Sequence, residues 1–225
     1  MLIGGWFVMT FVPDLGPEDF GPEVRYAVTG PNGELRRTFN IFHKLAHSPA
    51  VFQMLASTTR ATLYDMKLDP MLRELAICTV TRLVGATYPY QQHIEAARRL
   101  GIDDAKLLAL PVYRLHPTFT DQERAVMCFA EELTIRVEAS TEAKERVASF
   151  LSVEERVELA WTIGFYNAVA RVATACDVQI EAVRPESSPA RPASITGSSN
   201  QGPVGGLETG VPGSAAERPL SFLSA

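Results

Sequence analysis

The chain has 225 residues, of which 46% are hydrophobic, and its formal net charge is −5 at neutral pH. This length suits one folded domain with appended segments, and the negative charge argues against a nucleic-acid or anionic-membrane partner. The three cysteines lie far apart in apolar surroundings. They predict buried thiols in a reducing, cytoplasmic compartment rather than a disulfide framework.

The first 38 residues are expected to form an N-terminal arm and loops ahead of a helical domain. Residues 1–12 are apolar, but they are too few to span a bilayer and lack the basic start of a signal peptide. We interpret them as a packing arm or a frayed end. A short helix is expected over residues 23–29, before a Gly-Pro-Asn-Gly turn.

The helical domain is expected to cover residues 39–183 and to begin with helices over residues 39–45 and 49–62. His43 and His47 lie four residues apart at the first of these helices. This spacing can in principle hold a metal, but no third ligand is recognisable, so no metal site is expected.

A helical hairpin at the centre of the chain carries the strongest pattern. Asp69 followed by Pro70 is typical of a helix start. The residues after Glu74 are apolar or small on every side of the helix, which indicates burial all round. A buried carboxylate needs a partner. That partner is either a catalytic group or an arginine in a structural ion pair, such as Arg73 or Arg82 from a neighbouring subunit.

The second helix of the hairpin supplies the candidate partner. Thr87 is the expected cap of this helix and Gly101 its expected end. His93 lies on its inward face, and a lone histidine on such a face is most often a core residue with satisfied hydrogen bonds. Here it shares a short hairpin with the buried Glu74, and Tyr88 precedes it by five residues. The combination predicts a metal-free acid/base site made of these three side chains.

Later helices complete the expected bundle. Thr120 to Glu123 and Ser152 to Glu155 are capping boxes, each of which predicts a helix start. The expected helices span residues 103–110, a stretch from residue 120 through residue 133, residues 141–151, and a final stretch from residue 152 towards residue 180.

A substrate-binding set is predicted from the last helix and the hairpin. Asn167 and Arg171 are four residues apart amid Ala and Val. An arginine in this setting can clamp a substrate carboxylate with two hydrogen bonds. The alternative is a structural pair with Glu74, Glu158 or an acid of a partner subunit. Tyr90, on the inward face of the hairpin, completes the predicted set.

The hairpin resembles a known family. The hairpin contains an Arg-Glu pair, a buried run, and then the patterns Tyr-x-Tyr-x-x-His and Ala-x-x-x-Gly. This order resembles the carboxymuconolactone decarboxylase family, within the alkylhydroperoxidase D-like fold. In that family a glutamate precedes the histidine by the interval seen between Glu74 and His93. The resemblance also includes Tyr88, and it covers roughly residues 39–181.

The motif departs from both branches of the family. Decarboxylase-type members carry Tyr-Glu-Trp-x-x-His, whereas this chain has Pro89 and Tyr90 at the two middle positions. Peroxidase-type members place a Cys-x-x-Cys pair just before the histidine. The matching positions here are Ala86 and Pro89, neither of which is a thiol. These departures affect the expected substrate more than the expected fold.

The resemblance implies an all-α, alkylhydroperoxidase D-like bundle with a central helical hairpin, assembled as a homotrimer or homohexamer. It implies a cofactor-independent carbon–carbon lyase that acts on a small carboxylate or lactone. Decarboxylation, dehydration or rearrangement of a lactone, hydroxy acid or keto acid would then serve aromatic degradation or secondary metabolism. One alternative is a non-catalytic oligomeric ligand-binding protein of the same fold. A second alternative is a peroxidase, but the missing thiol pair argues against it.

The remaining residues, 184–225, form a separate segment by composition. Nearly half of them are Gly, Pro or Ser. Such a segment buries too little apolar surface to offset the entropy lost on ordering, so we expect a disordered tail.

Overall fold

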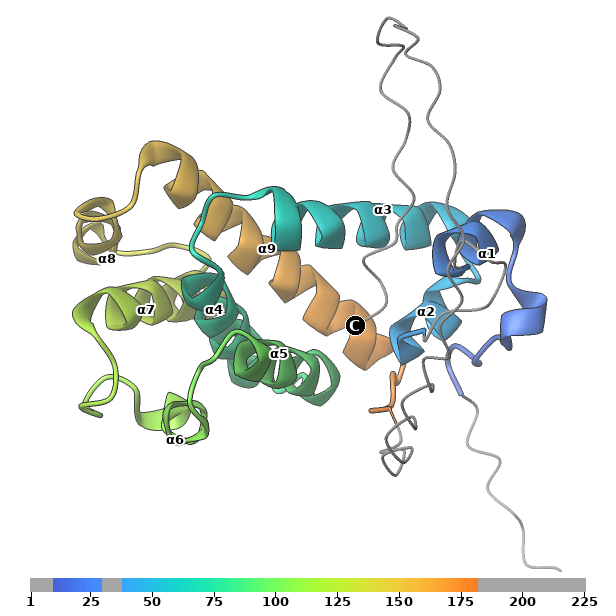
Figure 1. The fold of residues 1–225 in the computed structure, drawn as a ribbon, viewed down its shortest axis with the longest axis horizontal. Helices are drawn as coiled ribbons and strands as arrows, with labels where there is room; N and C mark the ends of the chain where they lie inside the picture. Colours follow the sequence, from blue (N-terminus) through green and yellow to red (C-terminus); the bar gives the residue numbers. More distant parts are fainter. Residues whose placement is uncertain (1–9, 30–37, 182–225) are drawn as a thin grey trace, which may run out of the picture.

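The structure, a computed structural model, describes residues 10–29 and 38–181, and over these residues it is helical without a β-strand (Figure 1). The all-α prediction is therefore confirmed. The tail expected after residue 184 and most of the apolar arm lie outside the described residues. In chain order the elements are η1 (Pro17–Asp19), α1 (Pro22–Val28), α2 (Asn40–Leu45), α3 (Pro49–Arg60), the π-helical turn η2 (Ala61–Asp65), α4 (Pro70–Leu83), α5 (Thr87–Arg99), α6 (Asp104–Leu108), η3 (Leu110–Val112), α7 (Asp121–Arg136), α8 (Thr141–Ala148) and α9 (Val153–Ala175).

Helix α4 lies at the centre of the bundle, packed against α5, α7 and α9 (Figure 1). Residues 73–81 of this helix are all buried. One apolar cluster joins α4 to α1, α2, α3, α7 and α9, and a second cluster on its other side joins it to α5, α6 and α7. An apolar cluster on each side accounts for the absence of a polar face. The start of α4 is also as expected, because the Asp69 carboxylate accepts hydrogen bonds from the amides of Met71 and Leu72 at 2.9 and 3.0 Å.

The hairpin turn between α4 and α5 differs from the prediction in one detail. Helix α5 begins at Thr87, but Ala86 is the cap residue and no side chain caps the helix, so the predicted threonine cap is wrong. Gly85 makes the turn with φ of 69°, a conformation that costs glycine little. Gly101 ends the helix as predicted, with φ of 91°.

The two predicted capping boxes are present. Thr120 and Glu123 exchange hydrogen bonds at the start of α7, and Ser152 with Glu155 does the same at the start of α9. Other boundaries differ from the prediction. Helix α8 ends at residue 148, the helix expected over residues 103–110 divides into α6 and η3, and α9 ends at residue 175. Asp177, with φ of 53°, lies just beyond that end in the left-handed region.

Helix α3 begins at Pro49, and the side chain of Ser48 makes no cap hydrogen bond to it. Val51 on this helix is 37% exposed. The apolar wall of α3 is supplied instead by Phe52 and Ala56, both fully buried.

The segment before α1 packs against α2 through backbone hydrogen bonds. Both histidines of the candidate metal pair take part: His43 Nδ1 lies 2.7 Å from the carbonyl oxygen of Leu15, and His47 Nε2 lies 2.9 Å from that of Pro13. These contacts give the two rings structural roles. Among the described residues there is no group of three or more metal-ligating side chains, and none of the helices has the length and apolar character to cross a membrane.

Candidate functional site

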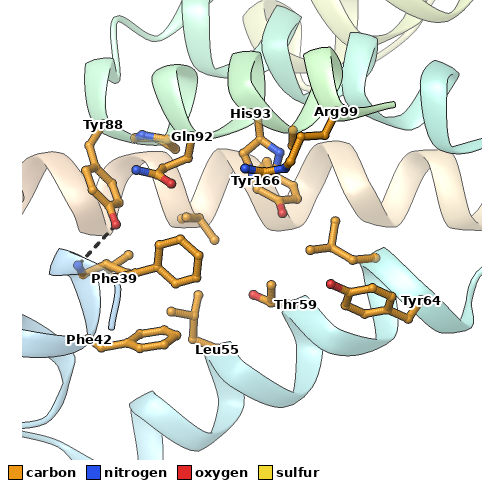
Figure 2. A pocket seen from close by; sticks show the side chains of 15 residues that line it. Phe39, Phe42, Leu55, Thr59, Tyr64, Tyr88, Gln92, His93, Arg99 and Tyr166 are labelled. Atoms are coloured by element: carbon orange, nitrogen blue, oxygen red, sulfur yellow. Dashed lines mark hydrogen bonds between the residues drawn. The ribbon is translucent and has the colours of Figure 1, made fainter. Parts of the chain in front are cut away.

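A cavity of about 150 Å³ lies between α5 on one side and α2, α3 and α9 on the others (Figure 2). Most of its wall is apolar, with Phe39, Phe42, Leu55 and Val169 among the contributors. Seven polar or charged side chains also reach it: Thr59, Tyr64, Tyr88, Gln92, His93, Arg99 and Tyr166.

The structure brings Glu74 and His93 together at this cavity. Glu74 Oε2 lies 2.6 Å from His93 Nδ1, while the side chain of Glu74 is 1% exposed and that of His93 is 12% exposed. A carboxylate accepts this hydrogen bond, so Nδ1 carries the proton in neutral His93. The unprotonated Nε2 is then the ring nitrogen left for a molecule in the cavity.

Arg73 also binds Glu74, so the structural ion pair considered from the sequence is present together with the histidine contact. Arg73 Nε lies 3.5 Å from Glu74 Oε1, and both side chains are buried. The arginine supplies the opposite charge that a buried carboxylate needs. Its Nε atom has no hydrogen-bond partner among the described residues, so the negative charge of Glu74 is important for stabilising this buried guanidinium.

Tyr166 on α9 contacts His93 from the opposite wall of the cavity. Its ring packs edge-on against the ring of His93, with centroids 4.5 Å apart and planes at 84°. Burial, together with the negative charge of Glu74, raises the pKa of Tyr166 well above its ordinary value, so the hydroxyl stays protonated. Figure 2 shows this hydroxyl pointing into the cavity. No such role for Tyr166 could be predicted from the sequence, because its contact with His93 joins two helices that are distant in the chain.

Tyr88 lines the cavity, but its hydroxyl already has a partner. It donates to Glu181 Oε1 at 2.9 Å and accepts from the amide of Ile41 at 3.4 Å, the contact drawn in Figure 2. Gln92 Nε2 donates to the second oxygen of Glu181, and the amide of Asn40 donates to the first oxygen. Burial, followed by the charge of Glu181, raises the pKa of Tyr88. The phenol therefore acts as a donor to Glu181 here.

The three predicted substrate-binding residues lie away from the cavity. Tyr90 packs against the second apolar cluster, on the other side of α5. Asn167 donates to Thr134 Oγ1 at 3.1 Å and to the carbonyl oxygen of Ile163 at 3.0 Å. Arg171 is exposed and donates to the side-chain oxygen of Asn167 at 2.8 Å. The structure does not bring these residues to His93.

A different arginine reaches the cavity. Arg99 lines it from the last turn of α5, and among the described residues no carboxylate pairs with it. Its neighbour Arg98, by contrast, binds Glu95 and Asp104. The spacing of the cavity-facing residues Pro89, Gln92, His93, Ala96 and Arg99 follows one side of a helix. This helical period is the sequence signal that connects position 99 with His93.

None of the described side chains that line the cavity is a cysteine. The positions matched to the peroxidase thiols are Ala86, which is buried, and Pro89, which forms part of the wall. Cys78 lies in the second apolar cluster. Burial raises the pKa of its thiol, and the nearby charge of Glu74 raises it further. The group is therefore a neutral packing residue rather than a nucleophile.

The chain is similar to known proteins in sequence and in fold. Residues 49–132 match the model of the carboxymuconolactone decarboxylase family. A curated relative, the uncharacterized protein YnjA of Escherichia coli, is 29% identical over 113 residues. That match covers 49% of this chain and 62% of the relative, so the chain spans less than two thirds of its length.

Solved structures extend the likeness to the fold. A peroxidase-related protein of Ralstonia eutropha with an alkylhydroperoxidase AhpD core has a TM-score of 0.65 at 18% identity, covering 75% of this chain and 90% of its own. The debrominase Bmp8 has a TM-score of 0.65 at 20% identity, covering 77% and 94%. Residues 49–132 are therefore similar to the carboxymuconolactone decarboxylase family, and the helical domain has the alkylhydroperoxidase D-like fold.

Proposed function

We propose that the protein is a cofactor-independent lyase that moves protons through His93 on a small lactone, hydroxy acid or keto acid. The observation that carries this proposal is the 2.6 Å contact between buried Glu74 and His93 Nδ1 at the wall of a ring-sized cavity. The contact fixes the ring so that Nε2 serves as the base. The similarity to this family supports enzymatic activity of this general kind.

The proposed chemistry begins with a carbonyl group bound beside His93. In proton abstraction, Nε2 takes a proton from the carbon next to the carbonyl, and the electron pair of that bond moves onto the carbonyl oxygen. In decarboxylation, the carbon–carbon bond to the carboxylate breaks, carbon dioxide leaves, and the pair moves to the same oxygen. After proton abstraction, the imidazolium so formed returns its proton to the carbon as the enolate pair moves back from the oxygen. In decarboxylation, His93 enters as the imidazolium, gives its Nε2 proton to the carbon in the same way, and regains a proton from water. Glu74 stabilises the imidazolium throughout.

Tyr166 is positioned to stabilise the negative charge that develops on the carbonyl oxygen of the substrate. Its hydroxyl stays protonated and points into the cavity, so it can donate a hydrogen bond to an enolate. The site predicted from the sequence contains Tyr88 rather than Tyr166. For Tyr88 to take it, the hydroxyl would have to exchange Glu181 for the substrate. We therefore propose Tyr166 as the main donor, with Tyr88 shaping the wall.

A ring-sized substrate fits the comparisons as well as the cavity. A solved complex of a cysteine-to-alanine variant of the debrominase Bmp8 holds 2,3,4-tribromopyrrole. That protein shares the fold of this chain, and its ligand is a single five-membered ring. We do not extend debromination to this chain, because no cysteine lies among the described cavity residues.

The test is turnover by the full chain with β-keto acids and γ-lactone carboxylates. Carbon dioxide release and deuterium incorporation from D₂O, followed by proton NMR, report the two reactions. We expect His93→Gln to lower either rate by about 100-fold or more, the usual contribution of a positioned acid or base. His116→Gln, at a histidine outside the cavity, should leave the rate unchanged. Equal turnover in the wild type and His93→Gln would favour the ligand-binding alternative.

We also propose a homo-oligomer, because α9 presents an exposed apolar stripe. The exposed fractions in this stripe are 69% for Val153, 66% for Val157, 55% for Trp161 and 38% for Val172. Apolar residues at helical spacing on a surface are typical of a protein interface. Sedimentation of the wild type at micromolar concentration should give a trimer or hexamer, and Trp161→Glu should lower the mass. A wild-type monomer would overturn this proposal.

A further inference from the structure

We infer that the cavity selects small cyclic monocarboxylates and fixes their direction, with the carboxylate at Arg99 and the uncharged end toward Tyr88 and Gln92. This inference rests on the proposed function, because it names the substrate class of the same site. It depends on opposite charges at the two ends of the cavity.

Arg99 makes one end of the cavity positive. Its side chain lines the wall, and no carboxylate among the described residues pairs with it. It follows His93 by six residues on α5, which places its Cα atom about 9 Å further along the helix axis. An arginine left without a protein carboxylate beside a cavity is suited to bind a carboxylate with two hydrogen bonds.

Glu181 makes the other end negative. Its carboxylate accepts hydrogen bonds from Tyr88, Gln92 and the backbone of Asn40, and these donors are all uncharged. Within the described part of the chain, no lysine or arginine forms an ion pair with it. Tyr88 and Gln92 line the cavity, so this charge lies directly behind its wall. A second carboxylate on a ligand would meet repulsion here.

The middle of the cavity fits one ring. Cavities of about 150 Å³ hold a single aromatic ring in other proteins. The apolar residues Phe39, Phe42 and Leu55 lie across from His93 in Figure 2. A ring bound there, with its carboxylate held by Arg99, places the atoms of its uncharged half near His93 and Tyr166.

Calorimetric titration of the full chain with three matched probes tests this inference. Benzoate carries one charge, benzamide has the same shape without charge, and benzene-1,4-dicarboxylate carries a charge at each end. We expect benzoate to bind wild-type protein about tenfold more tightly than benzamide, as a charge-assisted hydrogen bond implies, and more tightly than the dicarboxylate. The preference over benzamide should fall to about one in Arg99→Gln. It should persist in Arg98→Gln, whose arginine lies on the same helix but outside the cavity.

Glu181→Gln tests the other end, since it keeps an acceptor for Tyr88 but removes the charge. We expect this variant to bind the dicarboxylate several-fold more tightly than wild type, with circular dichroism confirming that each variant folds. The inference is overturned if wild type does not bind benzoate at millimolar concentration, if Arg99→Gln keeps the preference, or if Glu181→Gln does not improve dicarboxylate binding. Turnover that depends on His93 would still support the proposed function in those cases. An Arg99-dependent preference together with His93-independent turnover would overturn only the proposed function.

Discussion

Replacing Glu74 with glutamine should cost far more stability than the loss of one hydrogen bond. The substitution keeps the shape of the side chain and an acceptor for His93, but it removes the negative charge beside Arg73. The Arg73 side chain is 6% exposed, and its Nε has no hydrogen-bond partner among the described residues. The substitution would therefore leave this buried side chain without the carboxylate that lies beside it.

The magnitude follows from the burial of both partners. Breaking a buried ion pair from one side typically costs about 3–5 kcal/mol, because the remaining charge stays away from water. Removing both charges avoids that penalty, so the double variant Arg73→Met with Glu74→Gln should be more stable than Glu74→Gln alone. We expect a coupling free energy of about 2 kcal/mol between the two positions.

Urea denaturation followed by far-ultraviolet circular dichroism measures these free energies, at one fixed protein concentration because the chain is proposed to assemble. Asp65→Asn is the matched control. Its carboxylate lies 2.6 Å from Arg60, but the two side chains are 47% and 33% exposed. Removing it should cost less than about 1 kcal/mol. A loss of similar size in Glu74→Gln, or additive effects in the double variant, would refute the reasoning from burial.

Three further predictions concern the scaffold. Gly101→Ala should lower the unfolding free energy by about 1 kcal/mol, because φ of 91° is unfavourable for a residue with a Cβ atom; an unchanged urea midpoint would contradict this. Ser152→Ala should cost about 1 kcal/mol by removing the cap of α9, whereas Ser152→Thr should preserve it. In the native chain a thiol reagent at pH 8 should react first at half-buried Cys176, and the buried Cys78 and Cys128 should react only after denaturation. Fast reaction at Cys78 would contradict the packing described for α4.

The hairpin could be predicted from the sequence because its signals are local. Asp69, Pro70 and Gly101 mark helix ends by backbone chemistry that acts over a few residues. The apolar surround of Glu74 indicated burial and therefore the need for a partner. His93 lies one helix away in the same hairpin, so a short-range argument identified both members of the pair.

The rest of the site depends on contacts between distant segments. Tyr166 meets the His93 ring from α9, and Glu181 meets Tyr88 from beyond the end of that helix. No local pattern reports which helix crosses which, so neither contact could be derived. Arg171 shows the limit of a local pattern: its spacing from Asn167 places the two residues on one face, and the structure shows that neither lines this cavity.

Helix α5 separates two tasks that the proposed reaction requires, which are orienting the base His93 and binding the substrate. Glu74 approaches His93 from α4 and binds Nδ1, whereas the cavity side of α5 carries Gln92, His93 and Arg99 at helical spacing. Substitutions at Gln92 or Arg99 can therefore change which molecule binds without altering the contact that fixes the base. Pro89, where peroxidase relatives are expected to carry a thiol, belongs to the same wall. With proline there, the reactive group that α5 offers to a substrate is the imidazole, which favours proton transfer at carbon over chemistry at sulfur.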